Sequence, residues 1–301
     1  MKRKARKAFS LIELSIVILI IGIIVAGITQ SSRMISAYKL LIARNQTNNS
    51  PVASISNIVV WLDATSEASF NDNEAQDGSK VSIWKDLSLS SITKNNAQQS
   101  NALLRPTYKS RCINSLPCLN FDSANSQNLD INLSDIVNSN YTVFFVERRQ
   151  SGQNNSYFLA SENNTNCQDS LNLGYDHTDS FTMSIGGVCF YPTSTYSPEV
   201  SPAFTTPVTR IHSNIFNVRS EYGRYHYVNG QLARLFFDNA DPEPFFTLTS
   251  YNSVHIGGSS AVGYFYGDIA EVIIFNVALK AEDRKSIERY LVTKWGVVVA
   301  Q

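Results

Sequence analysis

The N-terminal part of the chain has a continuous apolar pattern that the rest of the chain lacks. From Leu14 to Ser32 there are 19 residues without a charge, most of them Ile, Val or Leu. As a helix they span roughly 28 Å, enough to cross the hydrocarbon core of a bilayer. The residues before this run are strongly basic: Lys2, Arg3, Lys4, Arg6 and Lys7. This charge bias predicts a transmembrane helix whose N-terminus stays in the cytoplasm.

Helical periodicity continues beyond the uncharged run. Apolar residues at Met34, Ile35, Tyr38, Leu41 and Ile42 keep the period of a helix to about Arg44. Residues 45–57 are polar and contain Pro51, which breaks helices. The pattern therefore predicts one helix over residues 9–44 and a linker over residues 45–57.

From Ile58 onwards the pattern is typical of strands. Short β-branched and aromatic runs alternate with turns rich in Gly, Asn and Ser. Asn229-Gly230 is a strong hairpin signal, because both turn residues need a positive φ. The clearest strands are expected at residues 58–62, 141–147, 170–175, 181–185, 225–232, 253–256 and 268–276. Residues 58–301 are thus predicted to form a β-sandwich.

A short amphipathic helix is predicted near the C-terminus, from Glu282 to Lys294. Its apolar stripe contains Ile287, Tyr290, Leu291 and Trp295, and Gly296 stands where a helix often ends. The expected fold class is therefore mainly β: an N-terminal transmembrane helix, a jelly-roll β-sandwich and a short C-terminal helix.

Residues 8–13, Ala-Phe-Ser-Leu-Ile-Glu, resemble the type IV prepilin signature of type IV pilins, minor pilins and type II secretion pseudopilins. The resemblance implies that residues 1–8 are a leader, that prepilin peptidase cuts between Ala8 and Phe9, and that Phe9 becomes N-methylated. It also implies that Glu13 pairs with the free amine of a neighbouring pilin subunit during assembly. A lone carboxylate beside lipid needs such a partner.

Two departures from the signature favour a minor pilin or pseudopilin over a major pilin. Ala8 stands where Gly is usual, and Gln30 stands where many major pilins have a proline. A secretory signal peptide or a plain signal anchor has a similar charge pattern. However, neither of them explains a carboxylate at Glu13.

Several separated motifs in the large domain resemble the concanavalin A-like lectin/glucanase superfamily in its laminin-G-like form. They are Trp61-Leu-Asp-Ala64, Val81-Ser-Ile-Trp-Lys-Asp86, Leu119-Asn-Phe-Asp122, Tyr141-Thr-Val-Phe-Phe-Val146, Gly267–Asn276 and Lys294-Trp-Gly296. The resemblance covers about residues 58–297 and implies a jelly-roll of two antiparallel sheets. This fold hosts lectins, adhesins, hydrolases and inert spacers alike.

The expectation from the sequence is that the chain is not an enzyme. The Glu-x-Asp-x-x-Glu pattern of hydrolases in this superfamily does not occur. Asp268 and Glu271 are three residues apart on one strand, and alternation places them on opposite faces. The four histidines, His177, His212, His226 and His255, are scattered along the sequence.

The four cysteines, Cys112, Cys118, Cys167 and Cys189, follow the membrane segment on the side predicted to be extracytoplasmic. An even number in an oxidising compartment favours disulfides over zinc, and sequential pairing is the simplest of three connectivities. No cofactor is expected with certainty. The loop from Asn71 to Gly78 contains Asp72 and Asp77, which are candidate calcium ligands in a loop that fits no EF-hand; the alternative is a solvated acidic turn.

Charge and composition narrow the expected partners and location. The precursor has no net charge, and removal of residues 1–8 leaves 20 basic against 25 acidic groups, or −5. No basic cluster lies outside the leader, so nucleic-acid binding is not expected. The chain is expected first in a bacterial inner membrane as a single-pass protein, then in an extracellular pilus or a periplasmic pseudopilus.

Three functions compete on this reading. The favoured one is a minor pilin or pilin-like adhesin whose lectin-like head binds a glycan or a host surface. The second is a structural pilin or pseudopilin with a head that binds nothing, and the least favoured is a membrane-anchored polysaccharide hydrolase. Five tyrosines are candidates for stacking on sugars, with ordinary packing as the alternative: Tyr191, Tyr196, Tyr251, Tyr264 and Tyr266.

Overall fold

The computed structural model describes residues 10–89, 94–162, 171–177, 180–185, 205–217, 224–233 and 253–298. The chain divides into two units: residues 1–42, and a compact head of residues 43–301. Helix α1 (Leu11–Asn48) supplies the first unit and the start of the second. As predicted, the fold is mainly β, with an apolar N-terminal helix and a helix at the C-terminal end.

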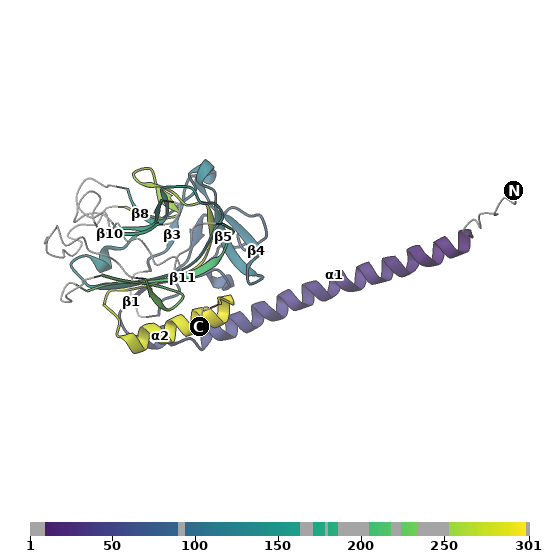
Figure 1. Cartoon of the computed structure of the whole chain (residues 1–301), viewed down its shortest axis with the longest axis horizontal. Coiled ribbons are helices and arrows are strands. Elements are labelled where there is room, and N and C mark those ends of the chain that lie inside the picture. Colours follow the sequence, from purple (N-terminus) through teal and green to yellow (C-terminus); the bar gives the residue numbers. More distant parts are fainter. Residues whose placement is uncertain are drawn as a thin grey trace, which may run out of the picture. The chain divides into compact units, whose positions relative to one another are not determined.

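Two antiparallel sheets form the head (Figure 1). The larger, eight-stranded sheet contains, in spatial order, β13 (Gln231–Ala233), β12 (Arg224–Val228), β11 (Thr209–Phe216), β7 (Tyr141–Arg149), β17 (Gly267–Phe275), β5 (Leu116–Phe121) and β4 (Thr107–Ile113), and β1 (Ile58–Asp63) pairs with β17. The seven-stranded sheet contains β10 (Ser180–Ile185), β9 (Leu171–His177), β8 (Ser156–Ser161), β14 (Val254–Ile256), β6 (Leu129–Ile131), β3 (Ala97–Gln98) and β2 (Ile83–Trp84).

Shorter elements complete the described part of the chain. Strands β15 (Gly258–Ser259) and β16 (Gly263–Tyr264) form a small ribbon. The 3-10 helices are η1 (Pro51–Ser54), η2 (Glu67–Ser69), η3 (Ala102–Leu104), η4 (Ser123–Asn125) and η5 (Ser134–Ile136), and helix α2 is Ala281–Trp295.

The hydrophobic core lies between the inner faces of the two sheets. Phe145 of the larger sheet packs on Phe158 of the smaller sheet, with ring centroids 4.5 Å apart. Trp84, Leu62 and Val272 are completely buried in the same core. Burying one such side chain stabilises the fold by about 1.5–3 kcal/mol. Because side chains alternate between the two faces of a strand, the apolar residues of both sheets lie on the inner faces, and their burial holds the two sheets together.

Helix α2 covers the outer face of the larger sheet. The predicted stripe is confirmed, because Ile287, Leu291 and Trp295 are buried. The helix ends at Gly296, whose φ of 64° is in the left-handed region that glycine tolerates. Across the interface, the Ser213 hydroxyl of β11 donates to Glu288 at 2.8 Å.

The predicted linker over residues 45–57 is wrong in part. Helix α1 continues to Asn48 and is followed almost directly by η1. Thr47 and Val52 are buried, and residues from Ala43 onward belong to the compact head. Contacts made by the last turn of α1, which periodicity alone does not reveal, keep this polar stretch ordered against the sandwich.

A β-bulge in β17 overturns the expected orientation of Asp268 and Glu271. The pairing register with β7 shifts between Ile269 and Glu271, which inserts one extra residue. Ile269 and Val272 therefore face the core, while Asp268 and Glu271 both lie on the outer face of the larger sheet. The two carboxylates share a face, contrary to the alternation rule.

Candidate functional site

The N-terminal segment combines an acidic first turn with an apolar helix. Ala8 and Phe9 lie outside the described residues. Glu13 lies in the first turn of α1, where its Oε2 accepts a hydrogen bond from the backbone N–H of Ser10 at 2.8 Å. Such a bond satisfies one of the donors that every helix N-terminus leaves unpaired.

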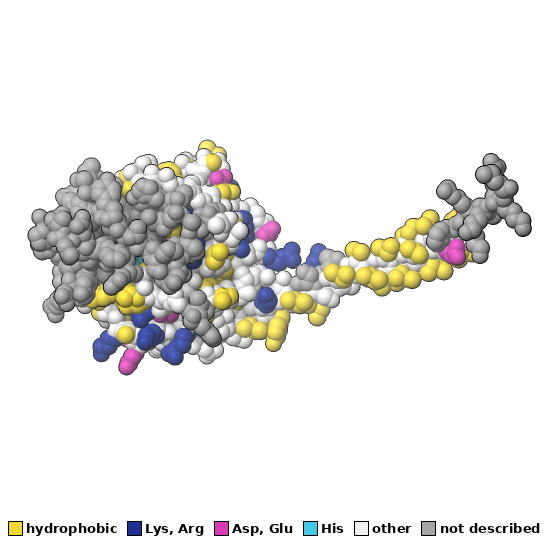
Figure 2. Space-filling model, viewed as in Figure 1, with side chains coloured by type: hydrophobic (Ala, Val, Ile, Leu, Met, Phe, Trp, Pro, Cys, Tyr) yellow, Lys and Arg dark blue, Asp and Glu magenta, His cyan; other side chains and the backbone are white. Residues whose placement is uncertain are grey.

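Apolar side chains cover much of α1 on the side that Figure 2 shows, with basic side chains in the part of the helix nearer its C-terminal end. Its large side chains, such as Ile18 and Ile23, are more than 60% exposed in the single chain. Among the described residues, α1 is the one helix long and apolar enough to cross a membrane. An apolar surface of this size needs lipid or other helices around it.

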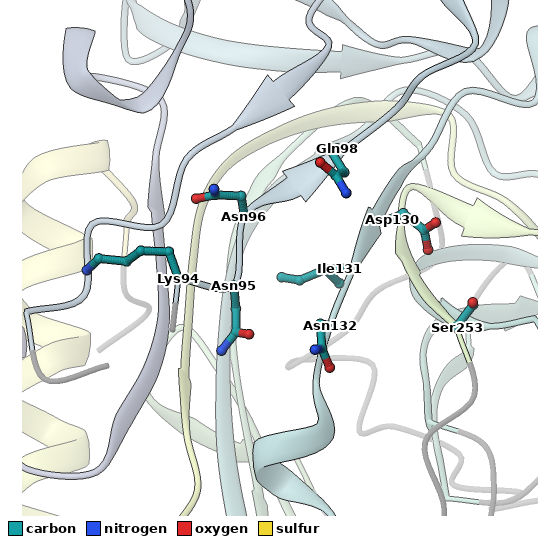
Figure 3. A pocket seen from close by; sticks show the side chains of 8 residues that line it. All are labelled: Lys94, Asn95, Asn96, Gln98, Asp130, Ile131, Asn132 and Ser253. Atoms are coloured by element: carbon teal, nitrogen blue, oxygen red, sulfur yellow. The ribbon is translucent and has the colours of Figure 1, made fainter. Parts of the chain in front are cut away.

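A polar pocket of about 320 Å³ lies at the outer edge of the smaller sheet (Figure 3). Strands β3 and β6 place Gln98 and Asp130 beside each other, because these two residues are partners in the register. Around them, Figure 3 shows the side chains that line the pocket: Lys94, Asn95, Asn96, Ile131, Asn132 and Ser253. Amide, carboxyl and hydroxyl groups thus dominate the lining, and its one apolar member, Ile131, belongs to the buried core of the sandwich.

Two features give this pocket its chemical character. Asp130 is half-exposed, and its Oδ1 lies 3.3 Å from the Nδ1 atom of His255, whose Nε2 lies 2.8 Å from Glu162. The Lys94 ammonium donates to the backbone carbonyl of Ser88 and extends away from Ile131 (Figure 3). The described lining therefore offers hydrogen-bond acceptors and amide donors to a ligand, while its one cationic group, the Lys94 ammonium, is bound to Ser88.

A second polar cluster lies inside the sandwich. Glu147 of β7 accepts hydrogen bonds from the Tyr175 hydroxyl at 2.7 Å and from His212 Nε2 at 3.0 Å. His212 Nδ1 lies 3.0 Å from His226 Nε2, and the guanidinium of Arg149 lies 3.9 Å from the centre of the Tyr175 ring. All these side chains are buried.

Burial controls the protonation of this interior cluster. It lowers the pKa of His212 and lowers the pKa of His226 well below the usual value, with the neighbouring His212 adding to the second effect. Burial alone would raise the pKa of Glu147, but the hydrogen bond from His212 and nearby positive charge lower it. The cluster therefore holds a carboxylate between neutral donors.

This cluster has no signature in the sequence, because its members are far apart along the chain. His212 and His226 were described as scattered, yet β11 and β12 pair antiparallel and set Asn214 opposite His226, which brings the two rings together. Glu147 joins them because β7 is the other neighbour of β11. Glu147 and His226 lie on strands that the sequence predicts, but β11, which carries His212, is not among the predicted strands, and the strand order has no signal in the sequence.

A third polar cluster lies between α1, α2 and the larger sheet. The Lys294 ammonium donates to Asp63 Oδ2 at 2.7 Å and to Glu271 Oε2 at 2.9 Å. It also donates to the Thr47 hydroxyl at 2.8 Å, which brings the end of α1 into the same network. The side chains of Lys294, Asp63 and Glu271 are fully excluded from solvent.

The cysteine and calcium predictions have different outcomes. A disulfide between Cys112 and Cys118 is confirmed, whereas Cys167 and Cys189 lie outside the described residues. The described residues contain one group of potential metal-ligating side chains, Cys112, Cys118 and Asp268, but the disulfide uses both sulfur atoms.

The predicted calcium ligands Asp72 and Asp77 are not part of that group. Asp72 is exposed, while Asp77 Oδ1 accepts hydrogen bonds from the Ser110 backbone N–H at 2.7 Å and from its hydroxyl at 2.9 Å. These bonds lower the pKa of Asp77. Calcium binding at this loop stays a prediction.

The candidate tyrosines fall into two groups. Tyr191, Tyr196 and Tyr251 lie outside the described residues. Tyr264 is partly buried and Tyr266 is 38% exposed, and neither of the two lines the polar pocket.

Comparison with known families identifies the N-terminal segment. A model of the prokaryotic N-terminal methylation motif matches residues 3–29. The motif implies processing by prepilin peptidase and assembly with other pilins. No curated protein matches the chain in sequence.

One solved structure with a TM-score above 0.5 has a fold similar to that of the head, and two others match with lower scores. The sialidase of Trypanosoma rangeli in complex with the inhibitor DANA has a TM-score of 0.52 and 13% identity, over 86% of this chain and 38% of that chain. The binding domain of Paraclostridial Mosquitocidal Protein 1 has a TM-score of 0.47 and 13% identity, over 80% of this chain and 55% of that chain. A third structure is domain 4 of AbnA, a GH43 extracellular arabinanase from Geobacillus stearothermophilus, in complex with arabinotriose. It has a TM-score of 0.43 and 13% identity, over 77% of this chain and 98% of that chain. The chain spans less than two-fifths of the sialidase.

These findings correct the prediction that the chain is not an enzyme. The structures with a similar fold include a sialidase, which is a glycoside hydrolase. Two grounds for the prediction also fail, because Asp268 and Glu271 share a face and because two of the histidines meet beside Glu147. At 13% identity the likeness to the sialidase shows the fold alone.

Proposed function

We propose that the chain is a minor pilin or pilin-like adhesin whose β-sandwich head binds a glycan or another surface ligand. The observation that carries this proposal is the joining of a methylation motif over residues 3–29 to a large head with a polar pocket on one sheet. In this proposal the chain enters the inner membrane with its N-terminus in the cytoplasm. Helix α1 then packs among other pilins, and the head is displayed outside.

The composition of the pocket supports a sugar as the ligand. Sugar hydroxyls donate and accept hydrogen bonds at short spacing, and the amides of Gln98 and Asn132 and the carboxylate of Asp130 offer both roles. A volume of about 320 Å³ is suited to one or two sugar rings. Single sites of this kind bind weakly, and many heads on one filament would raise the apparent affinity.

The charges around the pocket favour an uncharged or amino sugar over an acidic one. Asp130 and the nearby Glu162 are negative, and the Lys94 ammonium is engaged by the Ser88 carbonyl. A carboxylate on the ligand would meet like charge, which disfavours binding. Binding of acidic glycans in preference to their neutral counterparts would count against this pocket.

The test is a glycan array probed with the full chain in detergent, with and without calcium. Gln98→Ala and Asp130→Asn should each lower affinity about tenfold, because each removes hydrogen bonds of about 1–1.5 kcal/mol. Glu282→Gln, which changes an exposed carboxylate on α2, is the matched control and should bind as the wild type does.

Each result of the array has a defined meaning. Saturable binding that the pocket variants weaken supports the adhesin. Absence of binding to any glycan would favour a structural pilin or a pseudopilin with a non-binding head. Analysis of bound glycans for cleavage products belongs to the same experiment, because release of sugars would extend the function to hydrolysis.

A further inference from the structure

The cluster around Lys294 contains one cation and two carboxylates inside the protein. Lys294 lies between Asp63 and Glu271, and the aromatic side chains of Trp61, Tyr290 and Trp295 close the site. Removing three charged groups from water is costly even when they pair. One positive charge also leaves a second carboxylate without a counter-ion in this site.

The atoms around Asp63 are arranged for attack on its carboxyl carbon. Oδ1 accepts hydrogen bonds from the Thr65 backbone N–H and hydroxyl, both at 2.8 Å. Oδ2 accepts from Lys294 Nζ and from the Thr47 hydroxyl. One oxygen is therefore polarised in the manner of an oxyanion hole, and the nitrogen nucleophile is held at the other oxygen.

Glu271 is placed to exchange a proton with Lys294. Its Oε2 lies 2.9 Å from Lys294 Nζ, and its Oε1 is held by the Trp61 indole N–H at 2.9 Å and the Tyr290 hydroxyl at 2.8 Å. Burial raises the pKa of Glu271, and the charge of Asp63 raises it further, against the opposing effect of Lys294. A carboxyl group whose pKa is raised and which contacts the Lys294 nitrogen is suited to take up and return a proton, as general acid–base catalysis requires.

We propose that Lys294 and Asp63 form an intramolecular amide bond, with Glu271 as the acid and base. A proton of the Lys294 ammonium moves along its hydrogen bond to Oδ2 of the Asp63 carboxylate, which gives an amine and a carboxylic acid. Nζ then bonds to Cγ of Asp63 while Glu271 Oε2 accepts the second proton from Nζ, and the C–Oδ2 bond breaks so that Oδ2 leaves as water with that proton. The products are an amide and one water, and no oxidant or other reactant is needed.

The setting favours this condensation. Two groups held in contact react with effective molarities of about 10⁵–10⁸ M, which outweighs the preference for hydrolysis in bulk water. A pocket of about 260 Å³ adjoins Thr47, Asp63 and Thr65, and it gives the released water a way out.

The bond joins β1, the first strand of the head, to α2, its last helix, and so closes the head into a covalent loop. It requires no ligand of the head and stands apart from the proposed function.

The test is a tryptic peptide map of the full chain purified in detergent, reduced and alkylated before digestion. Trypsin releases Asp63 within residues 45–80, Glu271 within residues 235–280 and Lys294 within residues 290–301. The expected product is residues 45–80 joined to residues 290–301, lighter than the two peptides together by one water. Cleavage after Lys294 should be absent.

Variants give the controls for this map. Lys294→Arg keeps the charge but cannot form the amide, so the two peptides should separate, and Glu271→Gln should greatly reduce the linked product. Lys109→Arg is the matched control, because Lys109 also pairs with a buried aspartate, Asp268 at 3.3 Å, and it should leave the link intact. Wild-type protein that releases free residues 45–80 and 290–294 would overturn the proposal. A link to residues 235–280 would also overturn it, by naming Glu271 as the acceptor.

Discussion

The imidazole of His212 lies parallel to that of His226, with 5.3 Å between the ring centres and 3.0 Å from Nδ1 of the first to Nε2 of the second. Since His212 also contacts Glu147 through Nε2, the geometry fits one order of protons: His226 donates to His212, and His212 donates to Glu147. This order requires His212 to be neutral, because its Nδ1 accepts, and burial lowers the pKa of both rings. It ties β12, β11 and β7 together inside the head.

The head should lose stability in mildly acidic solution because of this pair. The pKa of both histidines is below 6.5 in the folded protein, so the unfolded chain binds more protons once the pH falls below about 6.5. The free energy of unfolding should fall by about 1 kcal/mol or more per pH unit below that point. Urea unfolding at pH 7.5, 6.5 and 5.5 measures it.

The variant His226→Gln isolates the contribution of the pair. It removes one titrating ring, so its unfolding free energy should depend less steeply on pH than that of the wild type. Arg289→Gln, an exposed change on α2, should keep the wild-type slope. A wild-type protein equally stable at pH 7.5 and 5.5 would contradict the neutral pair.

N-terminal processing should yield a chain that begins at Phe9. The methylation motif over residues 3–29 implies cleavage by prepilin peptidase after Ala8. Mass spectrometry of the membrane and filament fractions should find N-methylated Phe9 as the first residue. A mature protein that starts beyond Gln30 would instead indicate removal of an ordinary signal peptide.

Glu13 should be needed for assembly and not for folding of the head. Its carboxylate caps the first turn of α1 in the single chain and is not part of the hydrophobic core of the head. Within lipid or a helix bundle it needs a cation, which the amine of a neighbouring Phe9 supplies. Glu13→Ala should leave cleaved protein in the membrane and none in filaments. Fractionation followed by immunoblotting checks this, and normal incorporation would argue against it.

The sequence predicted the parts of the fold that depend on local chemistry. The Asn229-Gly230 turn has positive φ at both residues, at 51° and 81°, and Gly296 ends α2. The bulge that turns Glu271 to the outer face has no such local signal, because it depends on pairing with β7. The meeting of Glu147 with His212 depends on strand order in the same way. The residues that meet in the candidate sites are therefore set mainly by strand pairing between distant parts of the chain, which local sequence patterns do not reveal.

The head should require the last turn of α1 for full stability. A fragment that starts at residue 43 keeps Thr47 on Lys294 and Asp63, whereas one that starts at residue 58 loses these contacts and buried Val52. The shorter fragment should be less stable by about 2–5 kcal/mol, because buried polar groups lose partners and a cavity opens. Urea unfolding of the two fragments compares them directly, and equal stability would restore the linker interpretation.

The Cys112–Cys118 disulfide should stabilise the hairpin of β4 and β5 modestly. The loop that it closes is short, with a sequence separation of six, so the entropy model gives about 2 kcal/mol. Replacing both cysteines with serine should lower the free energy of unfolding by that amount. Thermal unfolding of the variant and of the oxidised wild type measures the difference, and the Lys109→Arg protein serves as a reference for nearby surface change.

The position of β17 in the larger sheet fixes when the head can fold. β17 pairs with β1, β5 and β7, yet it comes only near the end of the chain. The first strand of the head, Ile58–Asp63, must wait for residues 271–275 before it has a partner. Contacts so distant in sequence form slowly, because the loop between them must close first. The sandwich therefore stays open until residues 267–275 are available, so nearly the whole head must emerge before it can close.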